Sequence, residues 1–158
     1  SWKIIQSLPD VECSYDKEAS MIQSRFGHIQ INIHPQHMGF YKDLFAFMGW
    51  QTLEDSPSMF GVGPDIFNSF WFFAGANDAC NDYDGAGMNH IGLLVKTQGE
   101  VDEMCTYLHE RNIPPLFDTP RHRPEFAMNQ EYTYYQVMFE SPDRILFEIV
   151  YMGPRQKT

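Results

Sequence analysis

Three residues of this chain have the types and the setting of metal ligands: His28, His90 and Glu148. Two imidazoles and one carboxylate form a ligand face that binds divalent ions such as Fe²⁺, Mn²⁺, Zn²⁺ or Ni²⁺ and leaves positions open for water or substrate. Each residue alone has a simpler explanation, because strand histidines are commonly exposed and Glu148 could pair with an arginine. A metal site therefore requires that the fold bring the three together.

The stretch GHIQINIH, residues 27 to 34, indicates how His28 is presented. Its three isoleucines alternate with polar residues, which is the pattern of a strand with one apolar face. The other face carries His28, Gln30 and Asn32. In a surface strand these three would meet water. In a strand that walls a cavity they would line it, and Gln30 and Asn32 are then candidate substrate contacts.

The order of predicted elements repeats along the chain. A strand, a helix and three strands are predicted over residues 25 to 76, and the same order returns over 88 to 152. His28 and His90 each open the first strand of their half, and the Gly- and Asn-rich loop 75 to 89 links the halves. This internal duplication predicts an α+β fold of two βαβββ modules that form an incomplete barrel around a cavity.

The last predicted strand places Glu148 opposite an apolar face that includes Ile145 and Ile149. Burial of a lone carboxylate is costly unless a cation or a hydrogen-bond donor accompanies it. If the isoleucine faces of the strands pack on the helices, then His28, His90 and Glu148 all point into the cavity. The symmetry of the duplicated fold thus favours a shared metal site.

The turn before this strand decides which residues lie beside Glu148. If residues 141 to 144 form a simple two-residue hairpin loop, Val137 is opposite Glu148, and Tyr135 and Phe139 line the cavity. Tyr135 is then a candidate proton donor, and Phe139 a candidate substrate contact. A cavity tyrosine that only forms part of the wall is the alternative.

The basic run RHR lies in a predicted loop, residues 119 to 132, long enough to act as a lid. Arg121 is a candidate contact for an anionic substrate and His122 a candidate catalytic residue, whereas a solvated basic run is the alternative. His34 and His37 are predicted to be surface residues, because a His-x-x-His pair is weak evidence for a metal site.

The motifs HIQINI…FYKDLFAFMGW, NHIGLLV and YYQVMFESPDRILFEIV resemble those of the vicinal oxygen chelate superfamily. This superfamily includes glyoxalase I, extradiol dioxygenases, fosfomycin-resistance enzymes and bleomycin-binding proteins. The resemblance covers residues 21 to 152 and is strongest toward small, single-domain glyoxalase-like proteins. It implies a metal-dependent site that binds a small molecule through vicinal oxygens, and a homodimer. The high apolar fraction of so small a chain also suits a homodimer.

The chain departs from glyoxalase I-type sites at one position. Those sites use a second glutamate on the fourth strand of the first half, where this chain has SFWFFAG. The departure argues against the methylglyoxal reaction and favours the three-ligand face of dioxygenase-like members. Those members add a histidine and a tyrosine beside the metal ligands, for which His122 and either Tyr134 or Tyr135 are candidates.

Three functions are compatible with these residues. The first is a metal-dependent enzyme, lyase-like or dioxygenase-like, in which the ion stabilises an enolate or activates O₂. The second is a metal-free protein that binds a small aromatic molecule or antibiotic, as bleomycin-resistance proteins do, with an aromatic wall that includes Trp71. The third is a scaffold that retains the metal for stability. All three ligands are present here, which favours the enzyme.

Composition narrows the partners and the compartment. The formal net charge is −10, from 21 acidic and 11 basic residues, which disfavours nucleic acid and anionic membranes. Three scattered cysteines suggest neither a disulfide framework nor a zinc knuckle and fit a reducing, cytoplasmic setting. No apolar run is long enough to cross a membrane. Residues 1 to 24 are predicted to be an N-terminal extension to a glyoxalase-like domain, 25 to 152, and 153 to 158 a tail.

Overall fold

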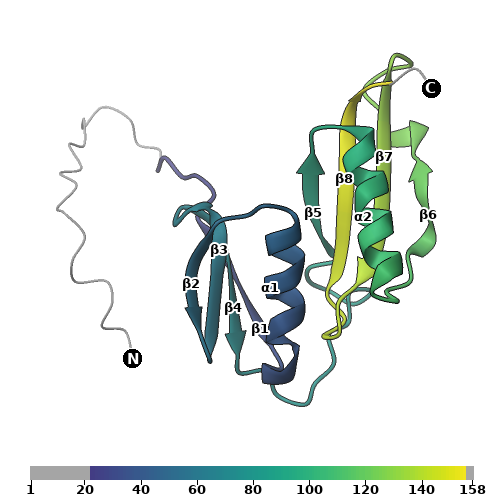
Figure 1. The fold of residues 1–158 in the computed structure, drawn as a ribbon. Helices are drawn as coiled ribbons and strands as arrows, with labels where there is room; N and C mark the ends of the chain where they lie inside the picture. Colours follow the sequence, from purple (N-terminus) through teal and green to yellow (C-terminus); the bar gives the residue numbers. More distant parts are fainter. Residues whose placement is uncertain (1–21, 156–158) are drawn as a thin grey trace.

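The chain folds into two modules with the same order of β-strands and α-helices (Figure 1). The computed structural model describes residues 22 to 155. The first module contains β1 (His28–Ile33), η2 (Pro35–His37), α1 (Met38–Phe47), β2 (Thr52–Ser56), β3 (Met59–Asp65) and β4 (Asn68–Ala74). The second contains β5 (His90–Val95), α2 (Gln98–Glu110), β6 (Leu116–His122), η3 (Pro124–Phe126), β7 (Tyr132–Glu140) and β8 (Leu146–Pro154). These elements confirm the predicted α+β fold with two βαβββ modules.

Each module forms its own four-stranded sheet. The strand order is β1-β4-β3-β2 in the first sheet and β5-β8-β7-β6 in the second. In both, the first and last strands of the module run parallel and the other neighbours are antiparallel. Within the described residues the sheets do not close into a barrel. Each sheet therefore has a face covered by its helix and an opposite face, called here the open face.

The β1 strand shows the two faces that its alternation predicted. Ile31 and Ile33 are buried in the core, whereas His28, Gln30 and Asn32 are exposed on the open face. The β-branched residues suit a pleated strand whose apolar side packs on a helix. The polar face of β1 is thus directed away from the core.

Helix α1 connects the two modules through aromatic packing. It lies between its own sheet and the second module (Figure 1). Phe45 is fully buried, and its ring centroid lies 5.5 Å from that of Phe72 on β4 and 6.4 Å from that of Phe147 on β8. The helix ends before Gly49, whose φ of +71° suits a glycine. A single hydrophobic core consequently spans both modules.

Helix α2 begins with a capping box. The side chain of Thr97 accepts a hydrogen bond from the Glu100 amide at 3.2 Å, and the Glu100 carboxylate accepts one from the Thr97 amide at 2.8 Å. Both satisfy amides that have no partner inside the helix. The buried face, which includes Val101 and Leu108, packs on β7 and β8.

The β7–β8 turn differs from the predicted two-residue loop. Met138, and not Val137, is opposite Glu148. The turn is longer because Ser141 organises it: its amide donates to the Ile145 carbonyl at 2.9 Å, and its hydroxyl accepts from the Ile145 amide at 3.0 Å. Arg144 adopts φ +59° within this turn. A shift of one residue reverses the face of every β7 side chain.

The remaining segments are irregular or only partly described. The 75 to 89 segment between the modules contains no helix or strand. Most of the proposed N-terminal extension lies outside the described residues, while β8 continues to Pro154, past the predicted domain end at 152. None of the helices described here is both long and apolar enough to cross a membrane.

Replacement of Phe45 with alanine should strongly destabilise the protein, because the cavity would open where the two modules meet. We expect the free energy of unfolding to fall by about 3–5 kcal/mol. Urea unfolding measures it, with Ile66→Ala as the control, since Ile66 is 45% exposed. A loss for Phe45→Ala as small as that of the control would contradict this role.

Candidate functional site

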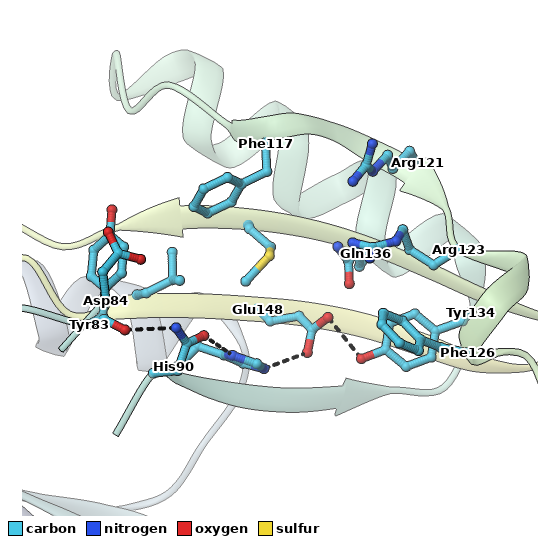
Figure 2. A pocket seen from close by; sticks show the side chains of 13 residues that line it. Tyr83, Asp84, His90, Phe117, Arg121, Arg123, Phe126, Tyr134, Gln136 and Glu148 are labelled. Atoms are coloured by element: carbon cyan, nitrogen blue, oxygen red, sulfur yellow. Dashed lines mark hydrogen bonds and ion pairs between the residues drawn. The ribbon is translucent and has the colours of Figure 1, made fainter. Parts of the chain in front are cut away.

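A cavity of about 590 Å³ lies on the open face of the second sheet (Figure 2). Alternating residues of β7 and β8 form its floor, and residues from the 75 to 89 segment, β5, β6 and η3 form its rim. Its floor includes the carboxylate of Glu148, beside Met138 and Leu146. Because only Glu148 is ionisable among these three, its contacts decide whether this part of the cavity can bind a cation.

Glu148 has two partners in the cavity. The side chain is 5% exposed, and its Oε1 accepts a hydrogen bond from the Tyr134 hydroxyl at 2.9 Å. Its Oε2 lies 3.2 Å from Nε2 of His90. Gly92, the residue paired with Glu148 across β5 and β8, leaves this space open, because a Cβ there would lie 3.3 Å from Oε2.

The second ring nitrogen of His90 is already engaged. Nδ2 of Asn89 donates to the Tyr83 carbonyl at 2.7 Å, so Oδ1 of Asn89 is the atom that lies 2.8 Å from Nδ1 of His90. An amide oxygen can only accept, so Nδ1 carries the proton. Nε2 of a neutral His90 then presents a lone pair to a carboxylate, and this contact is favourable only with a cation between them: a proton or a metal ion.

The pair fits a metal ion in spacing as well as in donor type. Two ligands bound at about 2.1 Å and separated by 90–110° are themselves about 3.0–3.4 Å apart. The 3.2 Å separation of His90 Nε2 and Glu148 Oε2 falls in this interval. The Asn89 contact also resembles the hydrogen bonds that orient metal-binding histidines. His90 and Glu148 could therefore serve as two ligands of one ion.

Tyr134 is a protonated donor in this site. Burial, followed by the hydrogen bond to Glu148 and the negative charge of Glu148, raises the pKa of Tyr134 to about 12. The hydroxyl thus keeps its proton at neutral pH and orients the carboxylate. A two-residue turn would have placed Tyr134 on the helix side, whereas the family resemblance offered either Tyr134 or Tyr135; the structure places Tyr134 in the cavity.

His28 does not lie beside the other two predicted ligands. It is exposed at the start of β1 on the first sheet, and the cavity that contains His90 and Glu148 is lined by other residues. Gln30 and Asn32 line a different cavity, of about 430 Å³, beside the 75 to 81 segment. Within one chain, the structure brings together only two of the three predicted ligands.

The prediction that Tyr135 and Phe139 line the cavity is wrong, because the longer turn shifts the register of β7. Tyr135 faces α2, where its hydroxyl donates to Oδ1 of Asp102 at 2.7 Å. Phe139 is fully buried in the core. His122 packs against the ring of Tyr135 and its Nδ1 lies 2.6 Å from the Thr133 hydroxyl, away from the cavity. Of the basic run, Arg121 and Arg123 do line the cavity.

A second cluster joins the modules and was not predicted. In the described part of the chain, His34, His37 and Asp143 are the one group that places three ligand atoms within 4.8 Å of one another, so it could hold a metal ion. Asp143 Oδ1 lies 2.5 Å from Nδ1 of His34 and 2.9 Å from Nδ1 of His37, and Oδ2 accepts from the Tyr41 hydroxyl at 2.7 Å. The histidines predicted at the surface are thus partly buried.

This cluster already satisfies its carboxylate without an ion. Burial by itself raises the pKa of Asp143, but the hydrogen bonds from the His34 amide, both imidazoles and Tyr41 outweigh it and hold the pKa below its usual range. These bonds connect the start of α1 with the β7–β8 turn. The geometry supports a structural role for Asp143 in joining the modules.

The fold of this chain is similar to that of several solved structures. No family model and no curated protein matches the sequence. Among solved structures, a presumed glyoxalase from Bacillus halodurans is 22% identical, with a TM-score of 0.67 over 82% of this chain and 96% of that one. A glyoxalase/dioxygenase from Nostoc punctiforme is 15% identical, with a TM-score of 0.61 over 87% and 99%. The lactoylglutathione lyase from Agrobacterium tumefaciens is 16% identical, with a TM-score of 0.56 over 82% and 95%.

Asp143→Asn should destabilise the protein at neutral pH by about 1–3 kcal/mol, because charge-assisted hydrogen bonds between the modules are weakened. A carboxyl whose pKa is lowered by folding stabilises above its unfolded value, and this contribution is lost as pH falls through the folded pKa. Urea unfolding at pH 7 and pH 3 should therefore show a difference from wild type that shrinks in acid. Exposed Asp78→Asn is the control, and an equal effect of both substitutions would contradict the assignment.

Proposed function

Given this fold, shared with glyoxalase and dioxygenase structures, we propose that the chain is a metal-dependent enzyme of the vicinal oxygen chelate type that acts on a small molecule. The observation that carries the proposal is the contact of His90 Nε2 with buried Glu148 Oε2 at 3.2 Å. Since Nδ1 of His90 is engaged by Asn89, this contact needs a cation. The donor set accepts Fe²⁺, Mn²⁺, Zn²⁺ or Ni²⁺.

The third ligand in this proposal is His28 of the partner subunit in a homodimer. His28 opens β1 as His90 opens β5, but the position equivalent to Glu148 in the first sheet is Trp71, paired with Gln30. The first module therefore offers a histidine without a carboxylate, and the second offers both. A first module that covers the open face of another chain's second module would complete one ligand set.

Exposed apolar side chains on the second module fit this arrangement. Leu94 and Met152 project from the sheet with exposures of 69% and 55%, and Phe117 and Phe126 on the cavity rim are 49% and 53% exposed. Large apolar groups gathered around a cavity are typical of a binding surface. A second copy would remove this apolar area from water.

The residues of the cavity have separate roles in the proposed chemistry. His90 and Glu148 would hold a divalent ion, which would supply a Lewis acid for the substrate. Tyr134 holds the carboxylate of Glu148 in position through a proton that it retains at neutral pH. Met138 and Leu146 are apolar residues of the cavity floor and would limit water around a bound substrate. The enzyme would be lyase-like or dioxygenase-like.

Metal content tests the ligand assignment. In protein purified without an affinity-metal step, element analysis should find a divalent ion, and Glu148→Gln and His90→Ala should each reduce it. A metal ion at a hundredfold excess over its Kd stabilises the folded state by about 2.7 kcal/mol. A chelator should therefore lower the melting temperature of the wild type but not that of these two variants. His109→Gln, an exposed change on α2, is the control.

Two outcomes would redirect the assignment. If His34→Gln with His37→Gln removed the metal and Glu148→Gln did not, the ion would belong to the cluster at Asp143. If wild type took up no divalent ion, the metal-free binding protein would become the better account of the cavity.

Complementation tests the shared site. His28→Ala protein and a His90→Ala, Glu148→Gln double variant should each bind little metal. In a twofold dimer, an equimolar mixture allowed to exchange subunits should regain about a quarter of the wild-type sites, because half of the dimers are mixed and each has one intact site. No recovery, or light scattering that shows a monomer at micromolar concentration, would contradict the homodimer.

A further inference from the structure

Gln136 carries a buried polar group without a partner. The residue is 2% exposed and lines the cavity, yet its Nε2 has no hydrogen-bond partner among residues 22 to 155. An unsatisfied buried donor costs about 1–3 kcal/mol, so native proteins rarely keep one without a use. The side chain faces the same cavity as Glu148, which suggests that a ligand accepts this hydrogen bond.

Arg121 is the direct neighbour of Gln136 across the sheet. The two residues are paired in the register of β6 and β7, so their side chains leave the sheet on the same face. Figure 2 shows both at the end of the cavity opposite Tyr83 and Asp84. In the described part of the chain, the Arg121 side chain takes part in no hydrogen bond or ion pair.

Arg123 shares this end of the cavity but is already engaged. Its Nε donates to Oε1 of Glu125 at 2.5 Å, and its guanidinium lies 4.7 Å from the centre of the Phe126 ring. At this end, Gln136 Nε2 and the whole Arg121 side chain have no hydrogen-bond partner within the described residues, whereas Arg123 is held by Glu125 through its Nε. A guanidinium beside an amide offers several N–H groups and one positive charge, which matches the planar oxygens of an oxyanion.

We propose that Arg121 and Gln136 form a subsite for an oxyanion group of the substrate, such as a carboxylate. This inference rests on the proposed function, because it assigns the non-reacting end of the molecule that the His90–Glu148 pair would bind. The strand of Arg121 is two strand spacings from that of Glu148, about 10 Å. The substrate class is thus a small molecule with an anionic group at one end, an apolar middle against Met138 and vicinal oxygens at the other end.

Anion binding by metal-free protein tests the subsite apart from the metal. In the presence of a chelator, ¹⁵N NMR spectra would follow the Gln136 side-chain amide during titration with benzoate, inorganic phosphate and neutral benzamide. Benzoate or phosphate should shift this resonance and benzamide should not. The stronger of the two anions identifies a carboxylate or a phosphate group. No shift with either anion would overturn the subsite, whatever the metal experiments show.

Variants add an independent test. Arg121→Gln should weaken anion binding at least tenfold, whereas Arg111→Gln, an exposed change at the end of α2, should leave it unchanged. Gln136→Leu should weaken binding as well and raise the melting temperature, because it removes the unpartnered amide. A purely structural glutamine would show the opposite effect on stability. Equal anion affinity of Arg121→Gln and wild type would refute the proposal.

Discussion

The burial of the Glu148 carboxylate is the constraint on which the rest of the site depends. A charge in this position needs compensation, and Tyr134 and His90 supply only part of it. Asn89 holds a proton on the far nitrogen of the imidazole, so that the near nitrogen meets the carboxylate across a proton or a metal ion. The space between His90 and Glu148 suits a cation. Gly92, paired with Glu148, keeps this space open, and Asn89 orients the His90 ring.

The packing of the modules explains why His28 lies apart from His90 and Glu148 within one chain. Phe45 and the hydrogen bonds to Asp143 bring α1 against the second module. The covered faces of the sheets thereby share one core, and the open faces are left for other contacts. His28 is consequently presented outward on its own sheet. A homodimer offers a direct way for the first module of one chain to meet the cavity of the other.

The metal-binding candidates and the anion-binding candidates of the cavity lie on different strands. Its carboxylate and imidazole lie on β8 and β5, and its unpartnered basic and amide donors lie on β6 and β7. Met138 lies on β7 opposite Glu148 and two residues from Gln136, so an apolar side chain borders both groups. This polarity would orient an asymmetric anionic molecule in one direction. The net charge of −10 does not oppose such binding, since a local guanidinium governs an interaction at contact distance more than distant, screened charges do.

The duplicated βαβββ order, the apolar faces of β1 and β8 and the inward position of Glu148 could be predicted from the sequence, because they follow from local periodicity and from the repeat. Which β7 residues face the cavity depends on the folded turn. The turn built on Ser141 directs Tyr134 and Gln136 into the cavity and Tyr135 and Phe139 into the core. The alternating pattern of β7 does not show which of its two faces is turned inward, because a shift of one residue in register exchanges them. The meeting of His34, His37 and Asp143, and the separation of His28 from His90, likewise depend on how two modules dock. That docking results from packing between residues far apart in the chain.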